Sequence, residues 1–268
     1  MVSAVRKILI QTYNLFVFCF LTTALAVPGF ALDVSKENLF QLATLAVRDG
    51  EYEHAVDFLK KSIEIDPKFV PAYNSLGIVY ETSNMADINE AIRYFRLATE
   101  IAPDSVESWN NLGRAYYTKG NFGGAEKAFL HSLALKPDQP EVEMSLGWVN
   151  LLGQSRGAEA IAHFSKIDVQ SANPMIYYGI GLAHLIEGER FQVFDAITEL
   201  RRRKREDLAV KLEDMLKKKV QLNSQPGTPL VTGIGDMHSV LSDELKAMGK
   251  SDGSTEGIQV RLRGPIRN

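Results

Sequence analysis

The sequence predicts an all-α protein in which short helix pairs stack into a solenoid, and three observations support this fold class. Similar segments recur about every 34 residues, as in LGIVY at 76–80, LGRAY at 112–116 and SLGWV at 145–149. Apolar residues inside each unit follow helical spacing. Glycine and proline divide the units, as at Gly120 and Pro137. A helix pair of this length cannot bury its apolar stripe alone, so neighbouring units must stack.

The unit at 106–139 shows how each helix is specified. The first helix has an apolar stripe at spacing i, i+3, i+7, formed by Trp109, Leu112 and Tyr116. The second helix has a stripe at i, i+4, i+8, formed by Ala125, Phe129 and Leu133. Gly113 and Ala125 are small, which predicts a close approach of the two helix backbones. Pro137 ends the second helix because proline lacks the N–H that a helix requires.

These residues together resemble the tetratricopeptide repeat (TPR) family. The family signature falls on Trp109, Leu112, Gly113, Tyr116, Gly120, Ala125, Phe129, Ser132 and Pro137. The resemblance implies a right-handed α-solenoid whose first helices line a concave surface that binds other proteins. It covers about two-thirds of the chain and indicates the fold more sharply than the partner.

The repeat pattern predicts three parts of the chain. A signal peptide covers 1–31, the TPR solenoid covers 32–223 and a flexible tail covers 224–268. Within the solenoid we expect repeats at 36–69, 70–105 and 106–139, degenerate repeats at 140–173 and 174–207, and a capping helix at 208–222. The fourth repeat is degenerate because Glu143 and Asn150 stand where apolar residues are expected.

The tail contains two short patterns between Gly, Pro and Ser-rich stretches. Leu241, Leu245 and Met248 form one helical stripe. Further on, IQVRLR at 258–263 alternates apolar and polar residues, which predicts a strand. A lone strand either stays unpaired or adds to the sheet of a partner.

The N-terminal segment indicates export. Arg6 and Lys7 precede an apolar run at 15–27, and small residues allow cleavage after Ala31. We therefore expect a periplasmic or secreted protein, and an uncleaved membrane anchor is the alternative. The single cysteine, Cys19, lies in this segment, so neither a disulfide framework nor a cysteine zinc site is expected in the body.

No motif predicts catalysis, a cofactor or a metal site. GQSRG at 153–157 spells the hydrolase pattern around Ser155, but that motif needs a strand before the serine and a helix after it. A hydrolase that uses Ser155 remains the enzyme alternative. The run RRRKR at 201–205 is interpreted as a solvated helix face or turn, with contact to anionic lipid headgroups as the alternative.

The candidate binding residues are those that the resemblance places in the concave groove: Gln41, Asn74, Ser75, Asn110, Asn111, Arg114, Tyr117, Ser145 and Trp148. Asparagine and glutamine amides can donate to and accept from an extended peptide backbone. Arg114 would favour a partner carboxylate. The aromatic rings of Tyr117 and Trp148 would anchor the partner, although Trp148 could instead pack in the core.

The predicted function is an exported, non-catalytic scaffold or adaptor that binds a protein or extended peptide segment in a cell-envelope complex. A dedicated assembly factor for a pilus or secretion machine is the alternative. Nucleic acid is not an expected partner, because a net charge of −3 and a pI near 6.0 give no attraction to it.

Overall fold

The computed structural model describes residues 35–83, 87–168 and 173–223. Within these residues it contains helices only: α2 (Lys36–Asp49), α3 (Tyr52–Ile65), α4 (Val70–Thr82), α5 (Ile88–Ile101), α6 (Val106–Thr118), α7 (Phe122–Leu135), α8 (Pro140–Gln154), α9 (Gly157–Phe164), α10 (Pro174–Glu187), α11 (Arg190–Arg202) and α12 (Glu206–Asn223). The expected signal peptide, the tail stripe and the tail strand lie outside the described residues.

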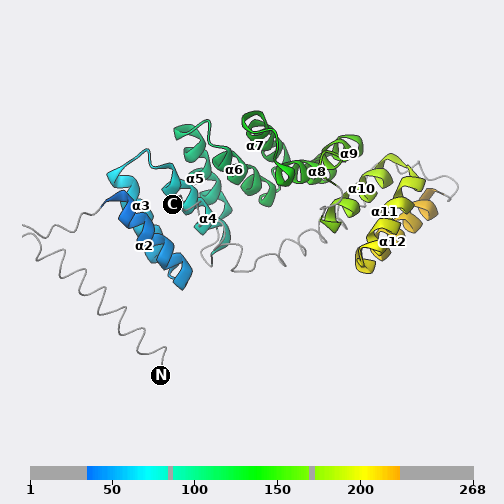
Figure 1. Ribbon diagram of the computed structural model, residues 1–268, viewed down its shortest axis with the longest axis horizontal. Helices are drawn as coiled ribbons and strands as arrows, with labels where there is room; N and C mark the ends of the chain where they lie inside the picture. The colour runs from blue at the N-terminus through cyan, green and yellow to red at the C-terminus, as the bar shows by residue number, and fades with distance from the viewer. Residues whose placement is uncertain (1–34, 84–86, 169–172, 224–268) are drawn as a thin grey trace, which may run out of the picture.

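The helices pack as consecutive pairs that form an α-solenoid (Figure 1). The first helices α2, α4, α6, α8 and α10 pack against the second helices α3, α5, α7, α9 and α11, respectively. Each second helix also packs against the first helix of the next pair, and α12 packs on α10 and α11. Stacking on neighbours buries the apolar stripe that a single pair leaves exposed.

The first helices lie on the inner side of the solenoid. Helix α4 contacts α6, and α8 contacts α10, whereas contacts between successive second helices are fewer. The row of helices that lies closer together lines the inside of the curve. We call the side of α4 and α6 that bears Asn74, Glu81, Asn110, Asn111, Arg114 and Tyr117 the inner face.

Glycines end several first helices, as the breaks in the repeat pattern predict. Gly50 and Gly188 follow α2 and α10 with φ of 80° and 83°, and Gly120 has φ of 79°. Glycine adopts this left-handed conformation without the strain that a Cβ atom causes. At the other end of the helices, polar caps are common, and Ser105 Oγ accepts from the N–H of Ser108 at the start of α6.

Three first helices carry a glycine beneath an aromatic ring of their second helix. The pairs are Gly77 with Phe95, Gly113 with Phe129, and Gly147 with Phe164. A Cβ atom at Gly113 would lie 2.6 Å from Cε1 of Phe129, which is closer than such atoms pack. The small residue thus makes room for a ring, and not for the second backbone that the sequence pattern suggested. This contact recurs at the same place in the second, third and fourth helix pairs and lets the ring pack directly on the first helix.

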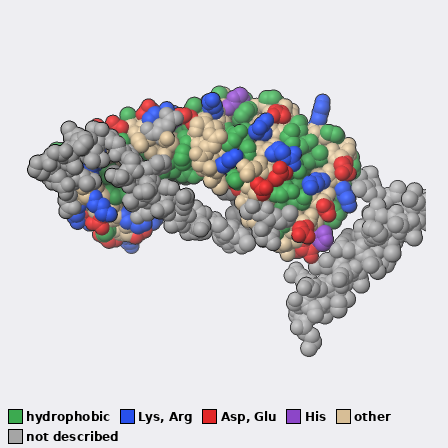
Figure 2. All heavy atoms as spheres, turned by 180° about the vertical axis from the view of Figure 1, so that it is seen from behind, with side chains coloured by type: hydrophobic (Ala, Val, Ile, Leu, Met, Phe, Trp, Pro, Cys, Tyr) green, Lys and Arg blue, Asp and Glu red, His purple; other side chains and the backbone are tan. Residues whose placement is uncertain are grey.

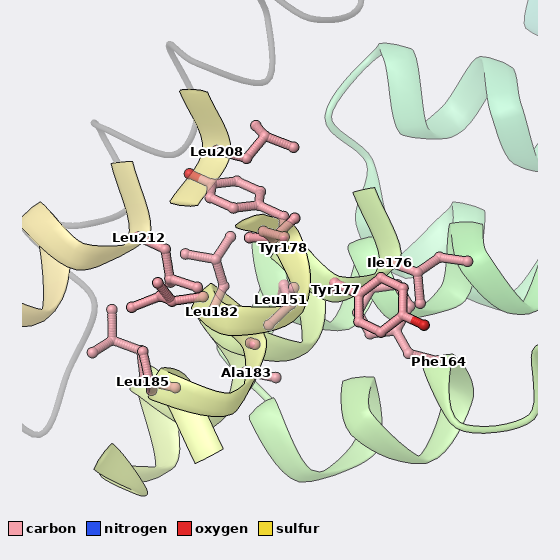
Figure 3. Packing of buried hydrophobic residues seen from close by; sticks show 14 of the residues in the cluster. Leu151, Phe164, Ile176, Tyr177, Tyr178, Leu182, Ala183, Leu185, Leu208 and Leu212 are labelled. Carbon is pink, nitrogen blue, oxygen red and sulfur yellow. The ribbon is translucent and has the colours of Figure 1, made fainter. Parts of the chain in front are cut away.

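The largest hydrophobic cluster extends over the five helices from α8 through α12. In Figure 3, Leu208 and Leu212 of α12 point towards Tyr178 and Leu182 of α10. Helix α12 therefore covers the apolar side of α10, which would otherwise face water. Of the helices in the described part of the chain, none has both the length and the hydropathy needed to span a bilayer.

Candidate protein-binding groove

Two asparagines of the inner face connect successive units. Nδ2 of Asn74 on α4 donates to Oγ of Ser108 on α6, at 3.0 Å. Nδ2 of Asn110 on α6 donates to Oε1 of Gln139, which precedes α8, at 2.8 Å. Both amides were expected to contact a partner, but each donates a hydrogen bond to the next repeat instead.

The same face holds three buried polar atoms without a hydrogen-bond partner among the described residues. They are Oδ1 of Asn74, Oδ1 of Asn110 and Nδ2 of Asn111. Asn74 and Asn111 are 4% and 6% exposed. Leaving a buried polar atom unpaired typically costs about 1–3 kcal/mol. The inner face therefore carries unused acceptors and an unused donor at neighbouring positions.

Arg114 of the inner face is already paired. Its Nη2 lies 2.7 Å from Oε2 of Glu81, which links α6 to α4. The Glu81 side chain is only 9% exposed, whereas that of Arg114 is 30% exposed. The expectation that Arg114 awaits a partner carboxylate is therefore changed, because such a carboxylate would have to compete with Glu81.

Tyr117 and Glu107 of α6 are partly shielded from water by the surrounding protein. Tyr117 is partly exposed, yet burial raises the pKa of its hydroxyl to about 12. Its ring meets that of Phe122 edge-on, with centroids 5.8 Å apart. Glu107 is exposed, but desolvation by the surrounding protein raises the pKa of its carboxyl. In both cases desolvation by neighbouring protein atoms disfavours the charged form of the group.

Trp148 lies in the hydrophobic core, as the alternative interpretation of the sequence held. It is 7% exposed and belongs to the cluster that joins α8 to α12. Its ring meets Phe164 edge-on at a centroid distance of 5.7 Å and lies 6.5 Å from the Tyr178 ring. A side chain in this position cannot anchor a partner without leaving the core.

The remaining candidates differ in access. Gln41 is exposed on α2. Ser75 is only 6% exposed. The hydroxyl of Ser145 donates to the carbonyl of Glu141 in its own helix, at 2.8 Å. Polar side chains at the same position of successive repeats therefore do not form a uniform contact surface; they are Gln41, Ser75, Asn111 and Ser145.

The two polar residues that make the fourth repeat degenerate are buried and have polar partners. Oε2 of Glu143 lies 2.6 Å from Nδ1 of His163, and Oε1 accepts from Lys166 at 3.0 Å. Oδ1 of Asn150 accepts from Arg156 at 2.6 Å. These contacts join α8 to α9 and to the turn between them. They are structural, and the sequence signalled them only as departures from the repeat pattern.

Ser155 does not lie in a nucleophile elbow. It follows α8 with φ of 54°, and α9 begins two residues later. A helix therefore precedes it, where the hydrolase motif requires a strand. The left-handed conformation serves to end α8. Across the described ranges, His, Cys, Asp and Glu side chains form no group of three that could hold a metal ion.

The basic run at 201–205 forms ion pairs instead of a free patch. Arg201 binds Glu206 and Glu213, and Arg202 and Arg203 both bind Glu199. Arg205 pairs with Asp207. On the face shown in Figure 2, positive and negative side chains are likewise interspersed. The arrangement fits the solvated interpretation of this run better than contact with lipid headgroups.

Comparison with protein families decides the identity of the fold. Three family models, each described as a tetratricopeptide repeat, match residues 37–69, 58–93 and 106–139. The chain is a tetratricopeptide repeat protein. The TPR glycine and aromatic positions in the third match are Gly113 and Phe129, the pair whose close contact is described above.

Solved TPR structures share this fold. MamA is 22% identical and has a TM-score of 0.54, with 73% of this chain and 97% of MamA covered. YrrB, described as a TPR protein with an unusual peptide-binding site, is 19% identical with a TM-score of 0.60, covering 68% and 94%. PilF of Pseudomonas aeruginosa is 21% identical with a TM-score of 0.52, covering 72% and 93%. A comparison with curated protein sequences gives no match.

Proposed function

We propose that this TPR protein is a non-catalytic scaffold that binds an extended protein segment along the inner face of α4 and α6, in an exported complex of the cell envelope. The unpaired amide atoms of Asn74, Asn110 and Asn111 carry the proposal. An extended peptide presents N–H and C=O groups in alternation, so it can offer both a donor and an acceptor to such a row.

The energy of the unpaired atoms favours a ligand. A hydrogen bond to an atom that is otherwise buried and unsatisfied recovers a cost that the free protein already bears. Because all three atoms are buried, each amide must turn towards the groove before it can bond to a peptide N–H or C=O group. The printed peptide-binding site of YrrB is a property of that protein, and it supports peptide recognition as the class of function to test here.

The ion pair between Glu81 and Arg114 limits which segment fits. An isolated acidic residue in the partner gains little from Arg114, since Glu81 holds the guanidinium at 2.7 Å. The exposed Glu107, whose carboxyl is poorly solvated, disfavours a second carboxylate near the start of α6. We therefore expect a neutral or basic segment, with apolar side chains against Tyr117.

The proposal is tested by site-specific photo-crosslinking in cells, followed by affinity measurements. A photoreactive phenylalanine analogue at Tyr117 should capture the partner, and the same analogue at Lys127, exposed on α7, serves as the control. With the captured segment, Asn111→Ala should weaken binding about tenfold, which corresponds to about 1.4 kcal/mol. Lys127→Ala should leave the affinity unchanged.

The stability of the same variants separates binding from folding. Asn111→Ala removes no hydrogen bond of Nδ2 in the free protein, so its unfolding free energy should fall by less than about 1 kcal/mol. Equal affinity of Asn111→Ala and Lys127→Ala would contradict a site on the inner face. Export is tested separately, because the mass of the protein recovered from the periplasm or medium should begin at Leu32.

A further inference from the structure

The C-terminal end of the solenoid has an apolar cleft between α11 and α12, the last two helices in Figure 1. Its volume is about 430 Å³, and its lining residues are Arg190, Phe194, Glu213, Leu216, Lys217 and Val220. Phe194 is 53% exposed, and Phe191, one turn earlier on α11, is 85% exposed. Large apolar side chains with this exposure beside a cleft indicate a surface that another segment covers.

The cleft lies where the next helix of the solenoid would pack. Helix α12 contacts both helices of the preceding pair, as α10 does with α8 and α9, so α12 stands in the position of a first helix. Each first helix before it is followed by a second helix. A second helix for α12 would pack mainly against α12, whose Glu213, Leu216, Lys217 and Val220 form one side of the cleft.

The chain that follows α12 contains one segment suited to this position. Leu241, Leu245 and Met248 follow the spacing i, i+4, i+7. Asp236 before this stripe and Gly249 after it are residue types that begin and end helices. Residues 237–248 therefore have the pattern of a short amphipathic helix, and α12 leads directly into them through 224–236.

The connection is long enough for the segment to return along α12. At about 3.3 Å per residue, an extended linker at 224–236 reaches roughly 40 Å. Helix α12 has 18 residues, which corresponds to a length of about 27 Å. The segment can thus reach any part of the cleft from the end of α12, as the second helix of a pair must.

The charges of the cleft also match this segment. Arg190 and Lys217 lie on its lining, and Lys219 lines the adjoining hollow. Glu213 is paired with Arg201 at 2.8 Å and with Lys217 at 3.2 Å. Arg190 is therefore the cation of the lining that has no carboxylate partner among the described residues. In the helical register, Glu244 flanks the stripe of Leu241, Leu245 and Met248 and can therefore meet Arg190.

We propose that residues 237–248 fold as a helix that occupies this cleft and completes the last helix pair. The proposal changes the expectation of a flexible tail for this segment only. It does not depend on binding at the inner face, because α11 and α12 carry none of the residues of that face.

Disulfide trapping in the full chain tests the contact. In a Cys19→Ser background, Phe194→Cys combined with Leu245→Cys should form a disulfide within one molecule under mild oxidation. The matched control pairs Leu245→Cys with Leu45→Cys, which is 45% exposed on α2 at the other end of the solenoid. We expect at least tenfold more intramolecular disulfide in the first pair. Equal yields overturn the proposal, and disulfide-linked dimers overturn it in favour of a second copy as the occupant.

Hydrogen exchange gives an independent measurement without new cysteines. Leu245→Asp places a charge in the stripe and should speed amide exchange in α11 and α12 at least tenfold. Ser239→Asp adds the same charge on the opposite side of the expected helix and should leave the exchange unchanged. Equal exchange in the two variants overturns the proposal, because a segment in the cleft must distinguish its apolar side from its polar side.

Discussion

Substitution of Trp148 by alanine distinguishes a core residue from a binding residue most directly. The ring is 7% exposed and contacts the rings of Phe164 and Tyr178. A tryptophan side chain buries about 150–250 Å², which corresponds to about 4–6 kcal/mol as an upper bound at 25 cal/mol per Å². Tryptophan to alanine changes in cores cost about 3–5 kcal/mol, so we expect a loss in this range.

The location of the loss is as informative as its size. Stability in stacked repeats is approximately a sum of terms between neighbours. The cluster that contains Trp148 extends from α8 through α12, whereas a separate cluster covers α2–α5. In Trp148→Ala, amide exchange should therefore accelerate in α8, α9 and α10 and stay nearly unchanged in α2 and α3.

The assay is urea unfolding followed by far-ultraviolet circular dichroism, with two control variants. Trp148→Phe keeps a ring and should lose much less stability. Leu130→Ala, on an exposed side chain of α7, should change stability by less than about 0.5 kcal/mol. In a Trp109→Phe background, the emission of Trp148 should be blue-shifted and poorly quenched by acrylamide. A decrease in unfolding free energy below about 1 kcal/mol, together with strong acrylamide quenching, would refute burial of Trp148. Trp148 would then be a candidate binding residue of the groove.

Two further predictions concern packing and charge. Gly113→Ala should lower the free energy of unfolding by up to about 2 kcal/mol, because the overpacking cost of about 1–3 kcal/mol exceeds the gain in helix propensity of about 1 kcal/mol. The control Gly123→Ala adds a Cβ with no atom near it, so it should be neutral or stabilising. Equal stability of the two variants would contradict the ring contact at Gly113. Arg205 holds the pKa of the Asp207 carboxyl at about 2, so the stability from this pair should be present above pH ~4 and be lost as the pH falls towards 2. Carbon NMR should give this pKa, and Arg205→Gln should return it to near 3.8; no change on substitution would show that the pair is not formed.

The fold could be predicted because the patterns that specify it involve residues close together in the sequence. The spacing of Leu112 and Tyr116, the glycine break at Gly120 and the proline after the second helix all act within one unit. Their physical basis is local, since helical periodicity and backbone restrictions depend on neighbours along the chain. The small residue Gly113 was also readable as a close contact, although the sequence did not show that its neighbour is a ring.

Which side chains are exposed in the groove was less predictable, because the exposure of a side chain depends on the repeat that packs against it. Trp148 has a repeat position that the TPR resemblance places in the groove. In the structure, α10 brings Tyr178 beside the Trp148 ring. A Cβ at Gly179 of α10 would lie 2.6 Å from the Phe164 ring and 3.3 Å from the Trp148 ring, so this glycine lets both rings pack against α10. Residues about 30 positions downstream, in the next unit, thus contribute to the burial of the tryptophan.

Local sequence patterns are enough to define the helix pairs, their repeat and the need for them to stack, because apolar periodicity acts within each unit. Which polar groups of the inner face are engaged depends instead on how the folded units stack. Arg114 meets Glu81 across two units, and Asn74 and Asn110 bond to the unit that follows. These partners lie about 30 residues apart in the chain, and stacking alone brings their atoms within about 3 Å. Hydrogen bonds and ion pairs require that distance, which a repeat pattern does not specify.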